Sequence, residues 1–120
     1  MHYSGLMLGF LFMAGCTKDE AGDYSPEDCD TVRPTYVLNI AAILEANCTF
    51  SGCHDAVTAS RGVRLYSWQE TVKVVNSTNV DLLCAIRRDG ICAYMPLALP
   101  KLDNHTIRLI ECWIENGMPQ

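Results

Sequence analysis

The chain has 120 residues, 49% of them hydrophobic, which allows one compact domain but not two. The formal charge of −5 lies in residues 17–30, where Lys18 stands against six acidic side chains, whereas eight basic and eight acidic residues balance from Thr31 onward. A neutral domain behind an acidic segment gives no support to nucleic-acid binding.

An apolar run over residues 6–15 is too short to span a bilayer as a helix and ends in small residues directly before Cys16. This pattern is typical of a secretory signal peptide. The tetrad Met13-Ala-Gly-Cys16 resembles a bacterial lipobox, in which the cysteine receives a lipid anchor such as palmitate. We therefore expect a signal peptide over residues 1–15 and a lipidated Cys16, and the alternative is an ordinary cleaved signal peptide with a stray thiol.

Residues 16–33 are expected to form an acidic, disordered tether between the lipid and a domain over residues 34–120. The tether opens with Thr17-Lys-Asp-Glu20, which looks like the export tag of Bacteroidetes surface lipoproteins. These features predict a protein that is lipid-anchored at the outer membrane, on its periplasmic or its cell-surface face.

The first half of the expected domain holds two predicted helices. Apolar residues at helical spacing over residues 35–48, with Thr35 at the start, predict a first helix that carries Cys48 at its far end. Residues 55–64 indicate a loop. Ser67 and Glu70 then have capping-box spacing, which predicts a short helix from Trp68 to about Val75.

Two more helices are predicted in the second half, and we find no strand with confident alternation. The third should run from Val80 to Arg88, closed by Gly90 in the left-handed conformation. Residues 91–101 contain two prolines and should form an extended, mostly apolar loop. The last helix should run from an Asp103 N-cap to Asn116, with Gly117 as its stop. The expected class is all-α.

The motif Cys48-Thr-Phe-Ser-Gly-Cys53-His54 carries the chemistry of the chain. A covalently bound c-type haem needs two thiols for its vinyl groups and an imidazole after the second thiol to bind the iron. The bridge of four residues is longer than the usual two, and Gly52 gives it conformational freedom. The alternative from the same residues is a Cys48–Cys53 disulfide with His54 on the surface.

Met95-Pro96 stands 41 residues after His54 on the predicted loop, ahead of the terminal amphipathic helix. This order of helix, motif, loop, Met-Pro and helix resembles class I cytochrome c. Over roughly Thr35 to Pro119, the sequence is similar to the small cytochrome-c-like lipoprotein domains of Bacteroidetes. The segments that carry this resemblance are ILEANCTFSGCHD, GVRLYSW, LLCAI, MP and IRLIECWIENGMP.

The resemblance implies a small class I cytochrome c-like fold, with about four helices and long loops around one covalent haem c. Cys48 and Cys53 would be the thioether attachments, His54 the proximal iron ligand and Met95 the distal one. The protein would then be an electron carrier and not an enzyme. It would exchange electrons with a redox partner protein of the envelope and touch the membrane through its lipid anchor.

Several of these assignments have competing interpretations. Met95 could instead be a core residue that fills a gap in the packing. The best alternative to Met95 as distal ligand is His105. Met118 is expected in a frayed terminus. Haem propionates could be bound by four residues that are otherwise ordinary surface or core side chains: Arg61, Arg64, Tyr66 and Trp68. The apolar side chains expected against haem are Leu83, Ile86, Leu97, Leu99, Ile107 and Ile110.

Lipid and haem would take three of the seven cysteines, which leaves four that allow three pairings: Cys29, Cys84, Cys92 and Cys112. We favour Cys84 with Cys92, which would tie the third helix to the following loop. Cys29 with Cys112 would then attach the tether to the last helix.

Two other functions compete with the electron carrier. One is a haem-free, disulfide-stapled surface lipoprotein that acts as a binding module. The other is a zinc site formed by Cys48, Cys53 and His54, which adjacent ligands and an oxidising compartment both disfavour.

Overall fold

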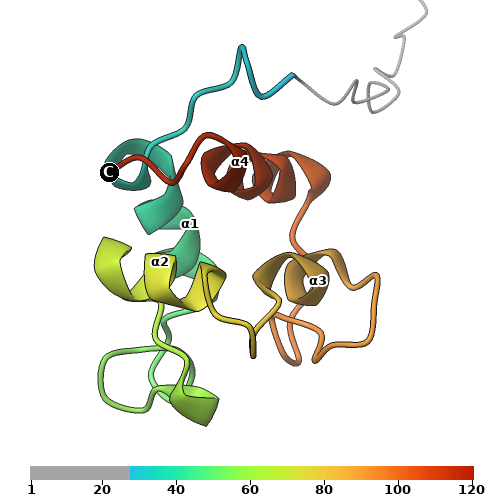
Figure 1. Cartoon of the computed structure of the whole chain (residues 1–120). Helices are drawn as coiled ribbons and strands as arrows, with labels where there is room; N and C mark the ends of the chain where they lie inside the picture. Colours follow the sequence, from blue (N-terminus) through green and yellow to red (C-terminus); the bar gives the residue numbers. More distant parts are fainter. Residues whose placement is uncertain (1–27) are drawn as a thin grey trace, which may run out of the picture.

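The computed structural model describes residues 28–120, and every regular element in that range is a helix (Figure 1). The expected all-α class is therefore confirmed for this part of the chain. The expected signal peptide, the lipidated Cys16 and the tether up to residue 27 lie outside the described residues. None of the helices between residues 28 and 120 is long and apolar enough to cross a bilayer.

The first helix starts with a π-helical turn, η1 (Tyr36–Ile40), and continues directly as α1 (Ala41–Asn47). Its N-cap is Thr35, as expected, because the Thr35 hydroxyl accepts the backbone N–H of Leu38 at 3.3 Å. The helix ends directly before Cys48, which occupies the C-cap position. This helix therefore delivers the cysteine-histidine motif.

Helix α2 (Trp68–Val75) has the predicted bounds. Its N-cap Ser67 accepts the backbone N–H of Glu70 at 3.3 Å, which is one half of the expected capping box. The Glu70 carboxylate instead pairs with Lys73 one turn later, at 2.6 Å. The side-chain half of the box is thus used for an ion pair along the helix.

Helix α3 (Leu82–Arg87) ends in a left-handed residue, but the prediction that Gly90 supplies it was wrong. Arg88 occupies that position with φ of 60°. Gly90 is needed for a different reason, since a Cβ there would lie 2.7 Å from the Sγ of Cys84. The glycine lets the chain pass close to a disulfide sulfur.

Helix α4 (Asn104–Glu115) begins after the expected Asp103 N-cap, and Gly117 follows its end with φ of +82°. It packs against η1 and α3, and its Trp113 is fully buried. The Trp113 ring lies 6.1 Å from the ring of Tyr36, centroid to centroid. The buried core gathers residues from all these elements: Ile40, Leu44, Leu65, Val74, Ile86, Leu102, Ile107, Ile110 and Trp113.

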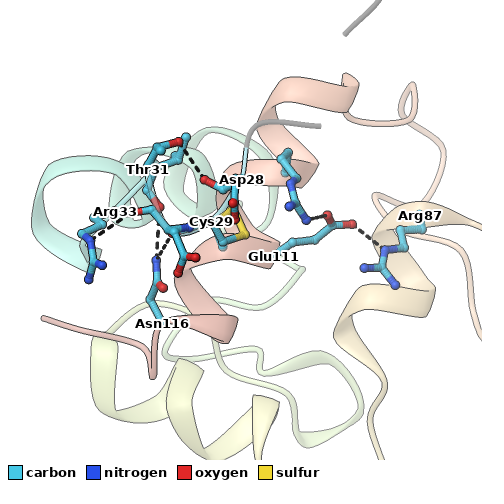
Figure 2. Close-up of a disulfide and its surroundings, with 11 residues drawn as sticks. Asp28, Cys29, Thr31, Arg33, Arg87, Glu111 and Asn116 are labelled. Atoms are coloured by element: carbon cyan, nitrogen blue, oxygen red, sulfur yellow. Dashed lines mark hydrogen bonds and ion pairs between the residues drawn. A yellow bond between two sulfur atoms is a disulfide. The ribbon is translucent and has the colours of Figure 1, made fainter. Parts of the chain in front are cut away.

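Residues 28–33, at the end of the acidic segment, lie against α4 (Figure 2). A disulfide joins Cys29 to Cys112, and both cysteines are buried. The Asn116 amide donates to the carbonyls of Cys29 and Val32, each at 3.1 Å. The chain is therefore attached to the domain from Cys29 onward.

A second disulfide joins Cys84 to Cys92, and the two bridges are the pairing that the sequence favoured. Cys84 belongs to α3 and Cys92 to the loop that follows it. The bridge therefore ties the end of the third helix to the beginning of the loop that carries Met95.

The last three residues are docked, so the expectation of a frayed Met118 was wrong. The Met118 carbonyl accepts the indole N–H of Trp68 at 2.9 Å. The Pro119 carbonyl accepts the indole N–H of Trp113 at 2.9 Å and the backbone N–H of Tyr36 at 3.0 Å. Two buried or half-buried indoles find their hydrogen-bond partners in this tail, which fixes it against the first helix.

Candidate functional site: the motif loop and the methionine loop

The motif loop (residues 48–62) contains both cysteines of the motif and His54. Cys48 is bonded to the end of α1 through its N–H, which donates to the Leu44 carbonyl at 2.7 Å. The Cys53 N–H donates to the Phe50 carbonyl at 2.9 Å, and the Cys53 carbonyl accepts the N–H of Ser60 at 2.8 Å. Both cysteines are therefore held by hydrogen bonds of their own backbone.

The Asp55 carboxylate ties the end of the four-residue bridge to the residues that follow the motif. Gly52 has φ of +89°, which agrees with the freedom expected of it. The Asp55 carboxylate accepts the N–H groups of Gly52 at 3.0 Å and of Val57 and Thr58 at 2.7 Å each. These hydrogen bonds, first of all that of Thr58, lower the pKa of Asp55. Asp55 organises the loop, a role that the sequence analysis missed although Asp is a common turn former.

His54 is held at three points. Its N–H donates to the Cys48 carbonyl at 3.1 Å, and its carbonyl accepts the N–H of Leu65 at 3.0 Å. The ring Nδ1 lies 3.1 Å from the Val63 carbonyl. Because a carbonyl only accepts, this contact places the proton on Nδ1 and leaves the lone pair on Nε2. Metal-binding histidines are commonly held in this way by the nitrogen that does not bind the metal.

Cys48 and Cys53 are free thiols in the structure. Burial and, as a smaller cause, the negative charge of a Cys53 thiolate raise the pKa of the Cys48 thiol to about 11. Cys53 is exposed. The structure therefore brings Cys48, Cys53 and His54 together in one loop without a bond between the two sulfurs.

The methionine loop (residues 89–101) holds Met95 by both of its backbone polar groups. The Met95 N–H donates to the Ala85 carbonyl of α3 at 3.0 Å. The Met95 carbonyl accepts the Nε–H of Arg88 at 3.4 Å, and the Nη2 of Arg88 donates to the carbonyls of Pro96 at 2.9 Å and Leu99 at 2.7 Å. Met95 is half-buried, so it does not belong to the buried core.

Both loops lie on the side of α2 and α3 that faces away from α4 (Figure 1). Each loop leaves large apolar side chains open to solvent. The motif loop exposes Phe50 and 92% of Val57, and the methionine loop exposes Tyr94, Leu99 and 76% of Leu97. Both loops therefore leave an unusual amount of apolar surface uncovered.

The other apolar residues expected against haem lie elsewhere in the structure. Ile86, Ile107 and Ile110 are buried in the protein core, and their contact with haem stays a prediction. Leu83 lines a cavity of about 350 Å³ between the end of α2 and the start of α3, together with Val75, Ser77, Thr78, Val80, Asp81, Leu82 and Ile114. None of the four residues assigned to haem lines this cavity.

The remaining candidates are also placed by the structure. The Trp68 indole is occupied by the Met118 carbonyl, which favours the core interpretation of this residue over a propionate contact. Arg61 and Tyr66 are exposed, and Arg64 is half-buried. His105 lies exposed in the first turn of α4.

Within residues 28–120, no three side chains of His, Cys, Asp or Glu come together as a metal site. The donor set that a zinc site needs is therefore not gathered in this range. A haem iron needs only two axial protein ligands, one of which can be a methionine thioether.

No family model matches the chain, and no curated protein or solved structure is similar enough to count as a match.

Proposed function

We propose that this protein is a membrane-anchored monohaem c-type cytochrome that carries electrons in the cell envelope. The observation that carries the proposal is the state of the six cysteines in residues 28–120. Four of them form two disulfides, and the two left as free thiols are Cys48 and Cys53 of the motif. Because unpaired thiols seldom persist in an exported protein, this pair is best explained by covalent attachment to a prosthetic group.

The donor set fits haem c. Two thiols separated by a four-residue bridge are available for the vinyl groups, and the His54 Nε2 is available for the iron because Nδ1 faces the Val63 carbonyl. Met95 offers a thioether from a loop whose backbone is fixed. The exposed apolar side chains of the two loops would cover the faces of the macrocycle.

Two of the four site residues would attach the haem and two would bind its iron. Cys48 and Cys53 would retain the group permanently, and His54 and Met95 would be the protein ligands of its iron, which would supply one-electron chemistry. Because both of these ligands would come from the protein, electron transfer is favoured over catalysis.

Membrane attachment through Cys16 belongs to the same proposal. A lipid on that cysteine would hold the domain at the outer membrane, on its periplasmic or its surface face. The tether would keep the domain near an envelope redox partner, which raises their effective concentration.

The experiment is production of the full-length protein in a bacterium that attaches haem c, followed by peroxidase staining on a denaturing gel. We expect the wild type to stain and its visible spectrum to change on reduction, because thioether-bound haem survives denaturation. The Cys48→Ala/Cys53→Ala variant should not stain.

The matched control is Cys84→Ala/Cys92→Ala, which also removes two cysteines but leaves the motif intact, and it should retain covalent haem. A colourless wild type whose Cys48 and Cys53 are joined as a disulfide by peptide mass spectrometry would instead support the haem-free binding module.

A further inference from the structure

Arg88 makes an unusual set of contacts for a helix-terminal residue. It ends α3 in the left-handed conformation, and its own N–H closes the helix on the Cys84 carbonyl at 2.9 Å. From that position its guanidinium donates to the carbonyls of Met95, Pro96 and Leu99. One side chain thus binds both the middle and the far part of the methionine loop.

Met95 is the residue that these contacts constrain most. Its N–H is bonded to the Ala85 carbonyl and its carbonyl to Arg88, so α3 holds the residue on both sides of its Cα. Fixing both peptide groups fixes the direction of the Cα–Cβ bond, and only the side-chain torsions remain free. The thioether can then sample only a small region next to α3.

The Cys84–Cys92 disulfide cannot do this alone. It ties the loop to α3 at Cys92, three residues before Met95, and leaves the rest of the loop to other contacts. Two prolines in the loop, Pro96 and Pro100, lack an N–H and so cannot donate backbone hydrogen bonds. Arg88 supplies donors to three carbonyls of this segment, those of Met95, Pro96 and Leu99.

We propose that Arg88 is the positioning residue for Met95, which it holds in the orientation needed for binding a metal through the thioether. The part of this proposal that concerns iron rests on the proposed function, whereas the part that concerns the loop does not. Lysine should not replace Arg88, because a single ammonium cannot reproduce the planar fork that reaches several carbonyls at once.

Two variants of the full-length mature protein test the proposal. Arg88→Asn keeps a residue that tolerates the left-handed conformation and removes the guanidinium. Arg88→Lys keeps the charge and removes the fork. The control is Arg87→Gln, which loses one positive charge from the neighbouring position, where Arg87 pairs with Glu111 at 2.6 Å and does not bind the loop.

The first measurement is amide hydrogen exchange at Met95, whose N–H is bonded to Ala85 in the structure. We expect exchange to be about tenfold faster in both Arg88 variants and unchanged relative to a core amide in Arg87→Gln, because the loop loses its charge-assisted hydrogen bonds. Unchanged exchange in Arg88→Asn would overturn the proposal whether or not the protein carries haem.

The second measurement is the visible spectrum of the oxidised protein, in which the absorption due to methionine bound to ferric haem should be lost or weakened in both Arg88 variants. Covalent haem itself should remain. Retention of the full methionine signal alongside faster exchange would overturn the positioning role. A protein without haem would refute the proposed function, and the exchange measurement would still decide whether Arg88 holds the loop.

Discussion

The Cys48 thiol is half-buried at the end of α1, and this burial is the first cause of its raised pKa of about 11. With Cys48 as a free thiol, we expect iodoacetamide to modify it at a rate that keeps rising up to about pH 11, because only the thiolate reacts. In the urea-unfolded chain the rate should level off near pH 9, because the pKa of the thiol there has its ordinary value of 9.0. Peptide mass spectrometry after timed quenching measures both profiles.

The raised pKa of Cys48 also makes the free energy of unfolding depend on pH. The folded state holds the Cys48 proton to higher pH than the unfolded chain, so this contribution is complete below pH 9 and is lost as the pH rises through about 11. Cys53→Ser removes the smaller cause and should move the labelling profile of Cys48 to lower pH. Identical profiles in folded and unfolded chains would contradict the assigned burial.

At His54, the sequence shows the reactive groups but not what holds them. Two cysteines before a histidine predict haem attachment through side-chain type and spacing, and this stays a prediction. The Val63 carbonyl that orients the imidazole is a backbone atom, and any residue type at position 63 could supply it. Arg88 was equally hidden, because its role depends on where the methionine loop folds back onto α3.

At the scale of helices, α4 depends on its N-cap. The Asp103 carboxylate accepts the Thr106 hydroxyl at 2.7 Å and the Thr106 N–H at 2.9 Å, and these hydrogen bonds lower the pKa of Asp103. We expect Asp103→Ala to lower the free energy of unfolding by about 1 kcal/mol, measured by urea denaturation at pH 7.

The pH dependence of that effect follows from the lowered pKa. The charged cap stabilises the protein above the pKa of the unfolded chain, and its contribution disappears as the pH falls through the folded value. The difference between wild type and Asp103→Ala should therefore shrink in acid. The control is Asp89→Ala, which removes an exposed carboxylate outside any cap; an equal loss from both variants would contradict the capping role.

The helices were predictable wherever periodicity and a local cap agreed. Ser67, Asp103 and Gly117 act within a few residues of their own positions, so their signals appear in the sequence. Gly90 was misassigned because a glycine can serve a left-handed turn or a close approach, and only the position of the Cys84 sulfur decides between them. The docked tail was missed because its partners, Tyr36, Trp68 and Trp113, are distant in the chain.

At the scale of the whole molecule, the two ends of the described chain meet the same helices. The Cys29 bridge attaches the N-terminal segment to α4, and the C-terminal tail bonds to the first helix and to the indole of Trp113. The two loops of the candidate site project from the opposite side (Figure 1). Long-range contacts from both ends of the described chain therefore hold the domain together on one side, and the two loops of the candidate site lie on the other side.

The two disulfides differ in what they should contribute to that closure. Cys29–Cys112 spans 83 residues and Cys84–Cys92 spans 8. A longer loop loses more entropy in the unfolded state, so the chain-entropy estimate is about 4.5 kcal/mol for the first bridge and about 2.5 kcal/mol for the second. We expect Cys29→Ala/Cys112→Ala to lower the free energy of unfolding more than Cys84→Ala/Cys92→Ala, by about 2 kcal/mol.

Urea denaturation of both double variants under one set of conditions measures that difference, and each variant serves as the control for the loss of two cysteines. The effects of the two variants on the methionine loop should have the opposite order. Removing Cys84–Cys92 should loosen this loop, whereas removing Cys29–Cys112 should leave it intact until the domain unfolds. A larger stability loss from removing the short bridge would show that the long one does not hold the domain closed.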